Sequence, residues 1–91
     1  MGEIVSFQAI VRGRVQGVGF RHFARQRAQA HGVSGFVRNL PDGAVEVHAE
    51  GAPEALSAFE SDVRLGPSFG RVDEAVVTAI RARGFRAFEI R

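Results

Sequence analysis

The sequence predicts an α+β fold for a single domain of residues 1–91, with the element order β-α-β-β-α-β and a short extra strand at the end. Several short segments alternate apolar and polar residues, which is typical of strands with one buried face. Two other segments repeat their apolar residues every three to four positions, which is typical of amphipathic helices. Glycine or proline separates most of these segments. With 45% hydrophobic residues, a chain of this length can bury one core.

The first strand and the first helix lie on either side of a glycine-rich loop. Apolar residues alternate over residues 4–12, and Gly13 ends this strand. The loop of residues 13–19 contains three glycines and leads into a helix. Gly32 supplies the left-handed residue expected at the end of that helix. The apolar face of the helix contains Phe20, Phe23, Ala24 and Ala28.

A hairpin and a second helix follow. Residues 33–39 and 44–50 have strand patterns, and the Leu-Pro-Asp-Gly turn at residues 40–43 joins them. The second helix opens at Gly51-Ala52-Pro53 and closes at Gly66-Pro67. Its buried stripe consists of Leu56, Phe59 and Val63.

Two more strand patterns, at residues 72–80 and 85–90, complete the chain. The resulting order predicts a ferredoxin-like sandwich, in which two helices cover one face of an antiparallel sheet. Because the chain has no Trp or Tyr, we expect most of its eight phenylalanines to anchor the core.

The sequence contains neither cysteine nor lysine, and these absences exclude several kinds of chemistry. Without cysteine there is no disulfide framework, thiolate zinc site, iron–sulfur cluster or cysteine nucleophile. Without lysine there is no Schiff base and no Walker A lysine. Any anion binding must therefore use arginine side chains and backbone N–H groups.

The net charge of the chain varies strongly along its length. It is +5 over residues 1–41, −6 over residues 42–74 and +3 over residues 75–91. A basic first segment suits an anionic partner, which is either a small phosphorylated substrate or a nucleic-acid backbone. No apolar run approaches the roughly 18 residues of a membrane span, and the start lacks the pattern of a signal peptide. We therefore expect a cytoplasmic protein with no membrane partner.

The loop of residues 13–19 is a candidate anion site. Its glycines allow consecutive backbone N–H groups to point at one place, where the following helix adds the positive end of its dipole. Arg21 stands at the start of that helix and can bind a phosphate with two donors. A flexible turn beside a solvated arginine explains the same spacing. The loop is not a Rossmann fingerprint, because His22 occupies the third glycine position.

Two longer runs of residues resemble the two signatures of the acylphosphatase family. The first is GRVQGVGFR at residues 13–21, and the second is GFVRNLPDGAVE at residues 35–46. With the order of elements, the resemblance covers essentially the whole chain. The animal enzymes often have Cys where Gly19 stands and a hydroxyl residue where Leu40 stands, so roles tied to those side chains do not carry over.

The resemblance implies an enzyme that hydrolyses acyl phosphates to a carboxylate and inorganic phosphate. It implies that Arg21 binds the phosphate and that Asn39 places the attacking water. The residues implied to bind phosphate are Val15, Gln16, Gly17, Val18, Gly19, Phe20 and Arg21. We expect a monomer with no cofactor, no metal and no nucleic-acid partner.

Such a reaction needs few catalytic groups. The leaving carboxylate has a conjugate acid with a pKa near ~4, so it departs at neutral pH without a proton donor. Positioning and stabilisation of the phosphoryl oxygens supply most of the catalysis, and backbone N–H groups with Arg21 can provide both. The amide of Asn39 is a poor base, so our hypothesis gives the proton of the water to a phosphate oxygen.

Other interpretations of single residues remain. Asn39 is also typical of a turn-entry residue whose amide binds local backbone. Glu46, His48 and Glu50 alternate along one strand and face one way, as in a metal site or on a solvated sheet face. Three ligands along one straight strand converge poorly on an ion, so we favour the solvated face. We expect His22 and His31 on the surface or at the helix C-terminus.

Two functions of other classes fit the same topology. An RNA recognition motif is one, because Arg83-Gly84-Phe85 begins like its aromatic signature, although Arg86-Ala87-Phe88 does not continue it. The other is a regulatory small-ligand domain, because acylphosphatase-like domains also occur inside carbamoyl-transfer proteins. Release of phosphate from a simple acyl phosphate distinguishes the enzyme from both.

Overall fold

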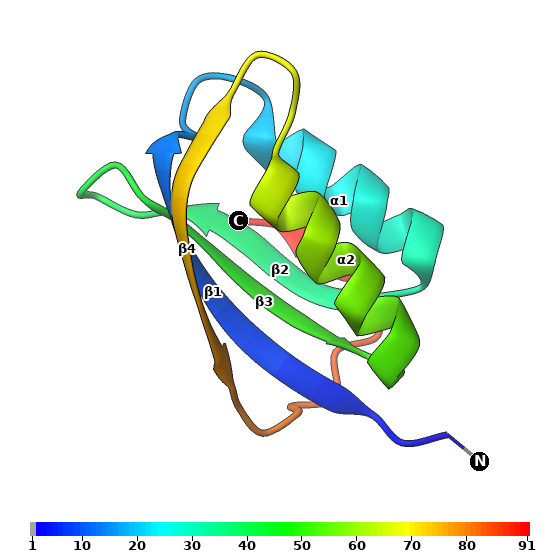
Figure 1. Cartoon of the computed structure of the whole chain (residues 1–91). Helices are drawn as coiled ribbons and strands as arrows, with labels where there is room; N and C mark the ends of the chain where they lie inside the picture. Colours follow the sequence, from blue (N-terminus) through cyan, green and yellow to red (C-terminus); the bar gives the residue numbers. More distant parts are fainter. Residues whose placement is uncertain (1) are drawn as a thin grey trace.

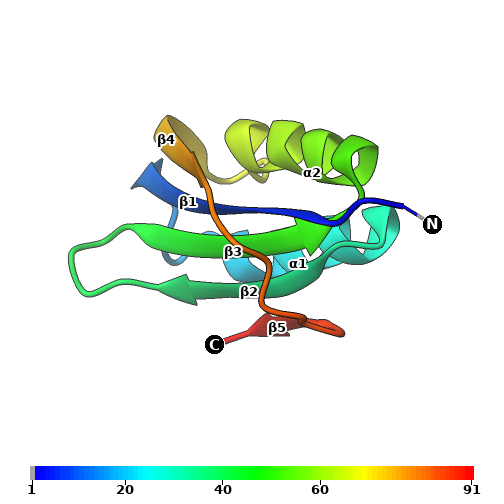
Figure 2. The ribbon, with the colours of Figure 1, turned by 90° about the horizontal axis from the view of Figure 1, so that it is seen from below.

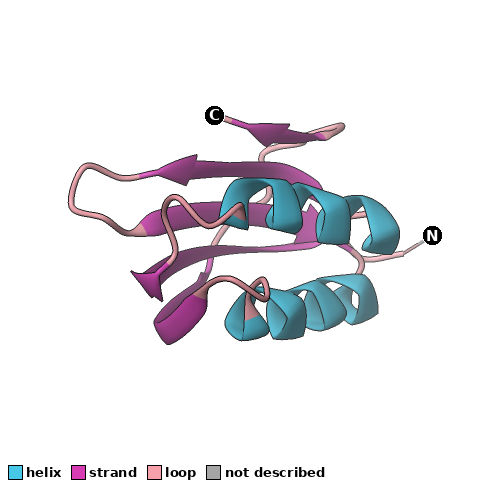
Figure 3. Ribbon diagram, turned by 90° about the horizontal axis from the view of Figure 1, so that it is seen from above, coloured by secondary structure: helices cyan, strands magenta, loops and turns pink. Residues whose placement is uncertain are grey.

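A computed structural model describes residues 2–91 and has the predicted ferredoxin-like architecture. Two helices lie side by side on one face of a five-stranded sheet of order β4-β1-β3-β2-β5 (Figure 1). Figure 3 shows the helices and the strands as two layers. The elements are β1 (Val5–Arg14), α1 (Phe20–His31), β2 (Ser34–Asn39), β3 (Val45–Gly51), α2 (Pro53–Leu65), β4 (Arg71–Ala79) and β5 (Phe88–Ile90).

The sheet is mixed, so the expectation of an antiparallel sheet is wrong at one edge. β5 runs parallel to β2, whereas the other neighbouring strands are antiparallel. Ala79 of β4 and Phe88 of β5 lie in the same row of the sheet, because the register joins them through Phe7, Ala49 and Gly35. The chain therefore crosses the sheet at the row where β4 ends. β5 can then extend only in the direction of β2.

Residues 80–87 form this crossing, and Figure 2 shows them passing over β3 and β2 on the face opposite the helices. They cover His48 and Glu50, which are each 2% exposed. Glu46, on the same face, is 8% exposed and is bound by the side chains of Gln8 and Arg38. The predicted solvated face is therefore wrong for these residues. No three His, Asp or Glu side chains of residues 2–91 lie close enough to hold a metal ion.

Glu50 holds the crossing segment against the sheet. Its carboxylate accepts hydrogen bonds from the backbone N–H groups of Arg83, Gly84 and Phe85, at 2.5, 3.0 and 3.1 Å. The Nε2 atom of His48 lies 2.7 Å from the same carboxylate. Because a carboxylate only accepts hydrogen bonds, this nitrogen carries the hydrogen. The rings of His48, Phe36 and Phe85 all pack against one another.

The core lies between the sheet and the helices and contains Phe7, Phe20, Phe59 and Phe88. Phe36 is also buried, but on the other face of the sheet, against His48 and Phe85. Five of the eight phenylalanines are therefore buried. The clearest exception is Phe69, which is 83% exposed. Neither helix within residues 2–91 is long and apolar enough to cross a membrane.

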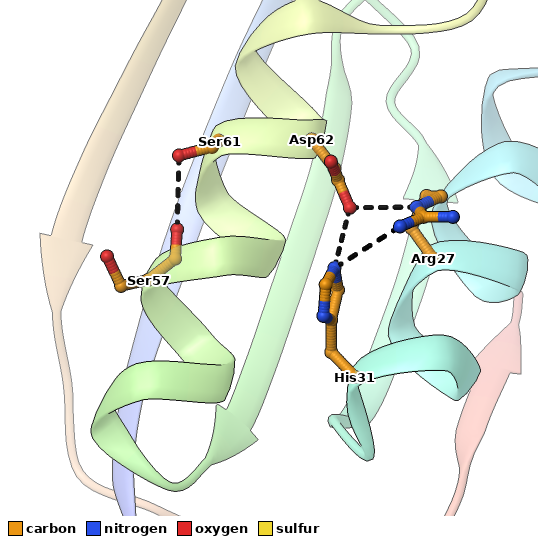
Figure 4. A network of polar contacts seen from close by, with 5 residues as sticks. All are labelled: Arg27, His31, Ser57, Ser61 and Asp62. Atoms are coloured by element: carbon orange, nitrogen blue, oxygen red, sulfur yellow. Dashed lines mark hydrogen bonds and ion pairs between the residues drawn. The ribbon is translucent and has the colours of Figure 1, made fainter.

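A polar cluster joins the two helices on their outer side (Figure 4). Asp62 of α2 accepts a hydrogen bond from Arg27 Nε at 2.8 Å, and its carboxylate lies 2.8 Å from His31 Nε2. His31 lies in the last turn of α1, where a positive charge interacts favourably with the negative end of the helix dipole. The cluster therefore joins the second half of α1 to α2.

Candidate active site

The site lies where β1 and β2 both end. Val45 of β3 pairs with Val11 of β1 on one side and with Asn39 of β2 on the other. β1 continues from this row into the loop of residues 15–19, which leads into α1. Asn39 and the start of α1 therefore come together although they are far apart in sequence.

The loop of residues 15–19, which we call the cradle, presents free backbone N–H groups. Among residues 2–91, none of its N–H groups donates to a protein acceptor. Gly17 and Gly19 have φ angles of 75° and 80°, a region that side-chain-bearing residues rarely adopt. α1 begins after Gly19 with no side-chain cap and no acidic residue in its first turn. The positive end of the helix dipole is therefore not neutralised by a carboxylate of that turn.

A pocket of about 210 Å³ joins the cradle to Asn39. It unites most of the predicted phosphate-binding residues, including Arg21, with Asn39. Gln16 and Val18 do not line it. The lining residues are Val15, Gly17, Gly19, Phe20, Arg21, His22 and Asn39.

The side chain of Gln16 ties the cradle to the β2–β3 turn. Its Nε2 donates to the carbonyl oxygens of Leu40 and Ala44, at 2.9 and 2.8 Å. In the same turn Asp42 accepts the Ala44 N–H at 3.0 Å. This hydrogen bond and the Arg12 guanidinium keep the pKa of Asp42 below its usual value. The spacing of the motifs gives no signal for the Gln16 contact, which joins residues 24 and 28 positions apart.

Asn39 is exposed, and its side chain forms no hydrogen bond within residues 2–91. The backbone of the turn is instead held by Gln16 and Asp42. The alternative role of Asn39 as a residue that binds local backbone therefore has no contact to support it. Its amide is free to bind a molecule in the pocket.

Arg21 contacts the end of the chain. Its Nη1 donates to the backbone oxygen of Arg91 at 3.2 Å. Arg91 is itself placed by its N–H, which donates to Val37 at 2.9 Å, and by its guanidinium, 4.2 Å from the centre of the Phe36 ring. The end of β5 thus restricts the position of Arg21. The sequence pattern indicates a last strand but not which neighbour it pairs with, so it gives no signal for this contact.

The sequence matches the acylphosphatase family model over residues 7–90. The acylphosphatase of Thermus thermophilus is 46% identical over 82 residues, which are 90% of this chain and 93% of the relative. The crystal structure of the Bacillus subtilis acylphosphatase is 41% identical, with a TM-score of 0.91 over 94% of this chain and 97% of that one.

A larger protein also contains a similar domain. The structure of full-length HypF in its phosphate- and nucleotide-bound form matches 99% of this chain with a TM-score of 0.89 and 28% identity. That match covers only 12% of HypF, whereas the two acylphosphatases are matched over nearly their whole length. This chain belongs to the acylphosphatase family of hydrolases.

Proposed function

We propose that the pocket hydrolyses acyl phosphates to a carboxylate and inorganic phosphate without a metal or cofactor. The cradle N–H groups and the Arg21 guanidinium bind the phosphoryl oxygens, and the Asn39 amide orients the attacking water. One observation carries this assignment: unpaired backbone donors, Arg21 and an unengaged amide all line one pocket.

The chemistry matches what these residues offer. The charge of the phosphoryl group spreads over three oxygens in the transition state, and fixed donors aimed at those oxygens stabilise it. A carboxylate leaves without protonation, so the pocket needs no proton donor, and none of its lining residues is an Asp or a Glu. The amide of Asn39 is a poor base. We therefore assign the proton of the attacking water to a phosphoryl oxygen.

Arg21 tests the phosphate part of the proposal. Its planar guanidinium can span two phosphoryl oxygens, whereas lysine offers one point charge. We expect Arg21→Lys to lower kcat/KM for acetyl phosphate by on the order of a thousandfold. A lysine variant within tenfold of the wild-type rate would assign phosphate recognition to the backbone alone. Wild-type activity should survive exhaustive chelation, and inorganic phosphate should compete with the substrate.

RNA binding is disfavoured by the position of the residues that suggested it. RNA recognition motifs stack bases on aromatic side chains of an open sheet. Here the backbone of Arg83-Gly84-Phe85 is bound to Glu50, and the Phe85 ring of the crossing segment packs on His48 of the sheet. Saturable binding of single-stranded RNA at physiological salt, without phosphatase activity, would reverse this choice.

A further inference from the structure

A second hollow, which we call the acyl groove, lies beside the phosphate pocket. It has a volume of about 720 Å³ and runs between α1 and the α2–β4 connection of residues 66–70. Phe23, Leu65 and Phe69 give it an apolar wall. Leu65 and Phe69 are 77% and 83% exposed, which makes them the most exposed large hydrophobic residues of the described chain. Exposed apolar side chains gathered in a groove are typical of a binding surface.

The acyl groove adjoins the phosphate pocket. His22 lines both hollows. The α2–β4 connection also packs directly on the chain at the cradle, because a Cβ atom on Gly70 would lie 2.9 Å from the Arg14 oxygen and 3.1 Å from Val18 Cγ2. A molecule held in the cradle can therefore extend past His22 into the acyl groove.

The geometry of in-line attack also places the acyl part of the substrate on the side of the acyl groove. The attacking and leaving oxygens lie roughly in line on opposite sides of phosphorus. Asn39 lies at the end of β2, and Figure 3 shows the β1–α1 loop between that end and the α2–β4 connection. A water held by Asn39 thus directs the acyl oxygen away from β2, toward the side where the acyl groove lies.

We propose that the acyl groove binds the acyl part of the substrate and that the enzyme prefers acyl phosphates with an aromatic or large apolar acyl group. This inference rests on the proposed function. An aromatic or large apolar acyl group that covers Phe69 and Leu65 removes their exposed apolar surface from water, whereas an acetyl group has only one methyl group with which to do so. The groove is also lined by Arg25, Gln26 and Gln29 of α1, which are exposed to water.

The test compares acetyl phosphate with benzoyl phosphate, using Phe69→Ala and the control Val76→Ala. Val76 is also an exposed apolar residue, but it lies on β4 outside the acyl groove. We expect Phe69→Ala to lower kcat/KM for benzoyl phosphate about tenfold and for acetyl phosphate less than twofold. Val76→Ala should change neither. Because Phe69 is exposed, its replacement should leave thermal unfolding unchanged, and Leu65→Ala should give a smaller loss of the same kind.

Three outcomes would overturn the inference. One is an unchanged ratio of the two kcat/KM values in Phe69→Ala, and another is an equal loss for both substrates. The third is a wild-type dimer in sedimentation that Phe69→Ala dissociates, which would assign the groove to a second copy of the chain. Failure of the wild type to hydrolyse either substrate would refute the proposed function itself. Hydrolysis of both substrates with an unchanged ratio would refute only the acyl groove.

Discussion

Glu50→Gln should destabilise the protein strongly, although the substitution changes only one atom and the charge. The carboxylate accepts from three backbone N–H groups and from His48 Nε2. A glutamine keeps one accepting oxygen and turns an NH2 group toward the other donors. His48 can change tautomer and accept from that group, but the Arg83 N–H cannot. At least one buried donor is therefore left without an acceptor.

The expected loss follows from these contacts. An unsatisfied buried donor costs about 1–3 kcal/mol, and the remaining hydrogen bonds lose the assistance of a charge. Removal of a buried charge offsets part of this cost. We expect the free energy of unfolding to fall by about 2–4 kcal/mol, which lowers the Tm by roughly 10–20 °C in a domain of this size.

The loss should depend on pH. Burial raises the pKa of Glu50, but hydrogen bonds from His48 and from the N–H groups of residues 83–85 offset it, and the pKa lies below the usual value of 4.5. A lowered pKa in the folded state gives stability that is complete above the unfolded-state pKa and is lost as the pH falls through the folded-state value. The difference between wild type and Glu50→Gln should therefore be constant near neutral pH and narrow below about pH 4.5.

The assay is thermal unfolding of the wild type, Glu50→Gln and the control Glu89→Gln at several pH values. The Glu89 side chain is 53% exposed, and its only ion pair within residues 2–91 is with Arg91, so its change should shift the free energy of unfolding by less than about 0.5 kcal/mol. Hydrogen exchange of residues 83–85 should accelerate in Glu50→Gln alone. A Glu50→Gln Tm equal to that of the control would show that Glu50 does not hold the crossing segment.

Three further variants test other parts of the structure. Asn39→Ala should lower kcat by about 100-fold or more with little change in phosphate affinity or Tm, because the Asn39 side chain has no hydrogen bond within residues 2–91. A lower Tm with an activity loss in proportion to it would instead support the role of Asn39 in holding the turn. Asp62→Asn should lower the free energy of unfolding by about 1–2 kcal/mol in thermal denaturation. The hydrogen bond from Arg27 lowers the pKa of Asp62 below 3.8; burial opposes this shift and the hydrogen bond from His31 adds to it. The stability that Asp62 contributes should therefore disappear as the pH falls below its folded-state pKa. A stability difference between wild type and Asp62→Asn that persists at lower pH would contradict this account. Gly19→Ala should weaken competitive inhibition by phosphate, because alanine disfavours a φ of 80°; unchanged inhibition would show that the cradle tolerates another backbone conformation.

Much of the fold could be predicted because its signals are local. Alternation of apolar residues in β1, helical spacing in α1 and the turn before Ala44 depend on neighbours in sequence, and the structure confirms these elements. The direction of β5 depends on the row in which β4 ends, which is set by pairing across the whole sheet. Alternation of apolar residues within one strand does not show in which row of the sheet that strand begins or ends. The expectation that the last strand would be antiparallel to its neighbour was therefore wrong.

The burial of Glu50 shows the same limit for side chains. Alternation placed Glu46, His48 and Glu50 on one face correctly. Whether His48 and Glu50 meet water depends on the path of residues 80–87, and Glu46 is covered by the side chains of Gln8 and Arg38 from neighbouring strands. At the candidate site, the two motifs predicted that Arg21 and Asn39 belong to one site, and both residues line the same pocket. The Gln16 and Arg91 contacts that set the shape of the pocket join distant parts of the chain and have no motif of their own.

The most direct test of the central claim is hydrolysis of acetyl phosphate in water labelled with ¹⁸O, with the spontaneous reaction subtracted. If the pocket holds the phosphoryl group in the cradle and the water at Asn39, water attacks phosphorus and the enzyme-dependent label appears in inorganic phosphate. The same label should fall with the rate in Asn39→Ala. Enzyme-dependent label in acetate would instead mean attack at the carbonyl carbon, and the assignment of the cradle, Arg21 and Asn39 to phosphoryl transfer would be wrong.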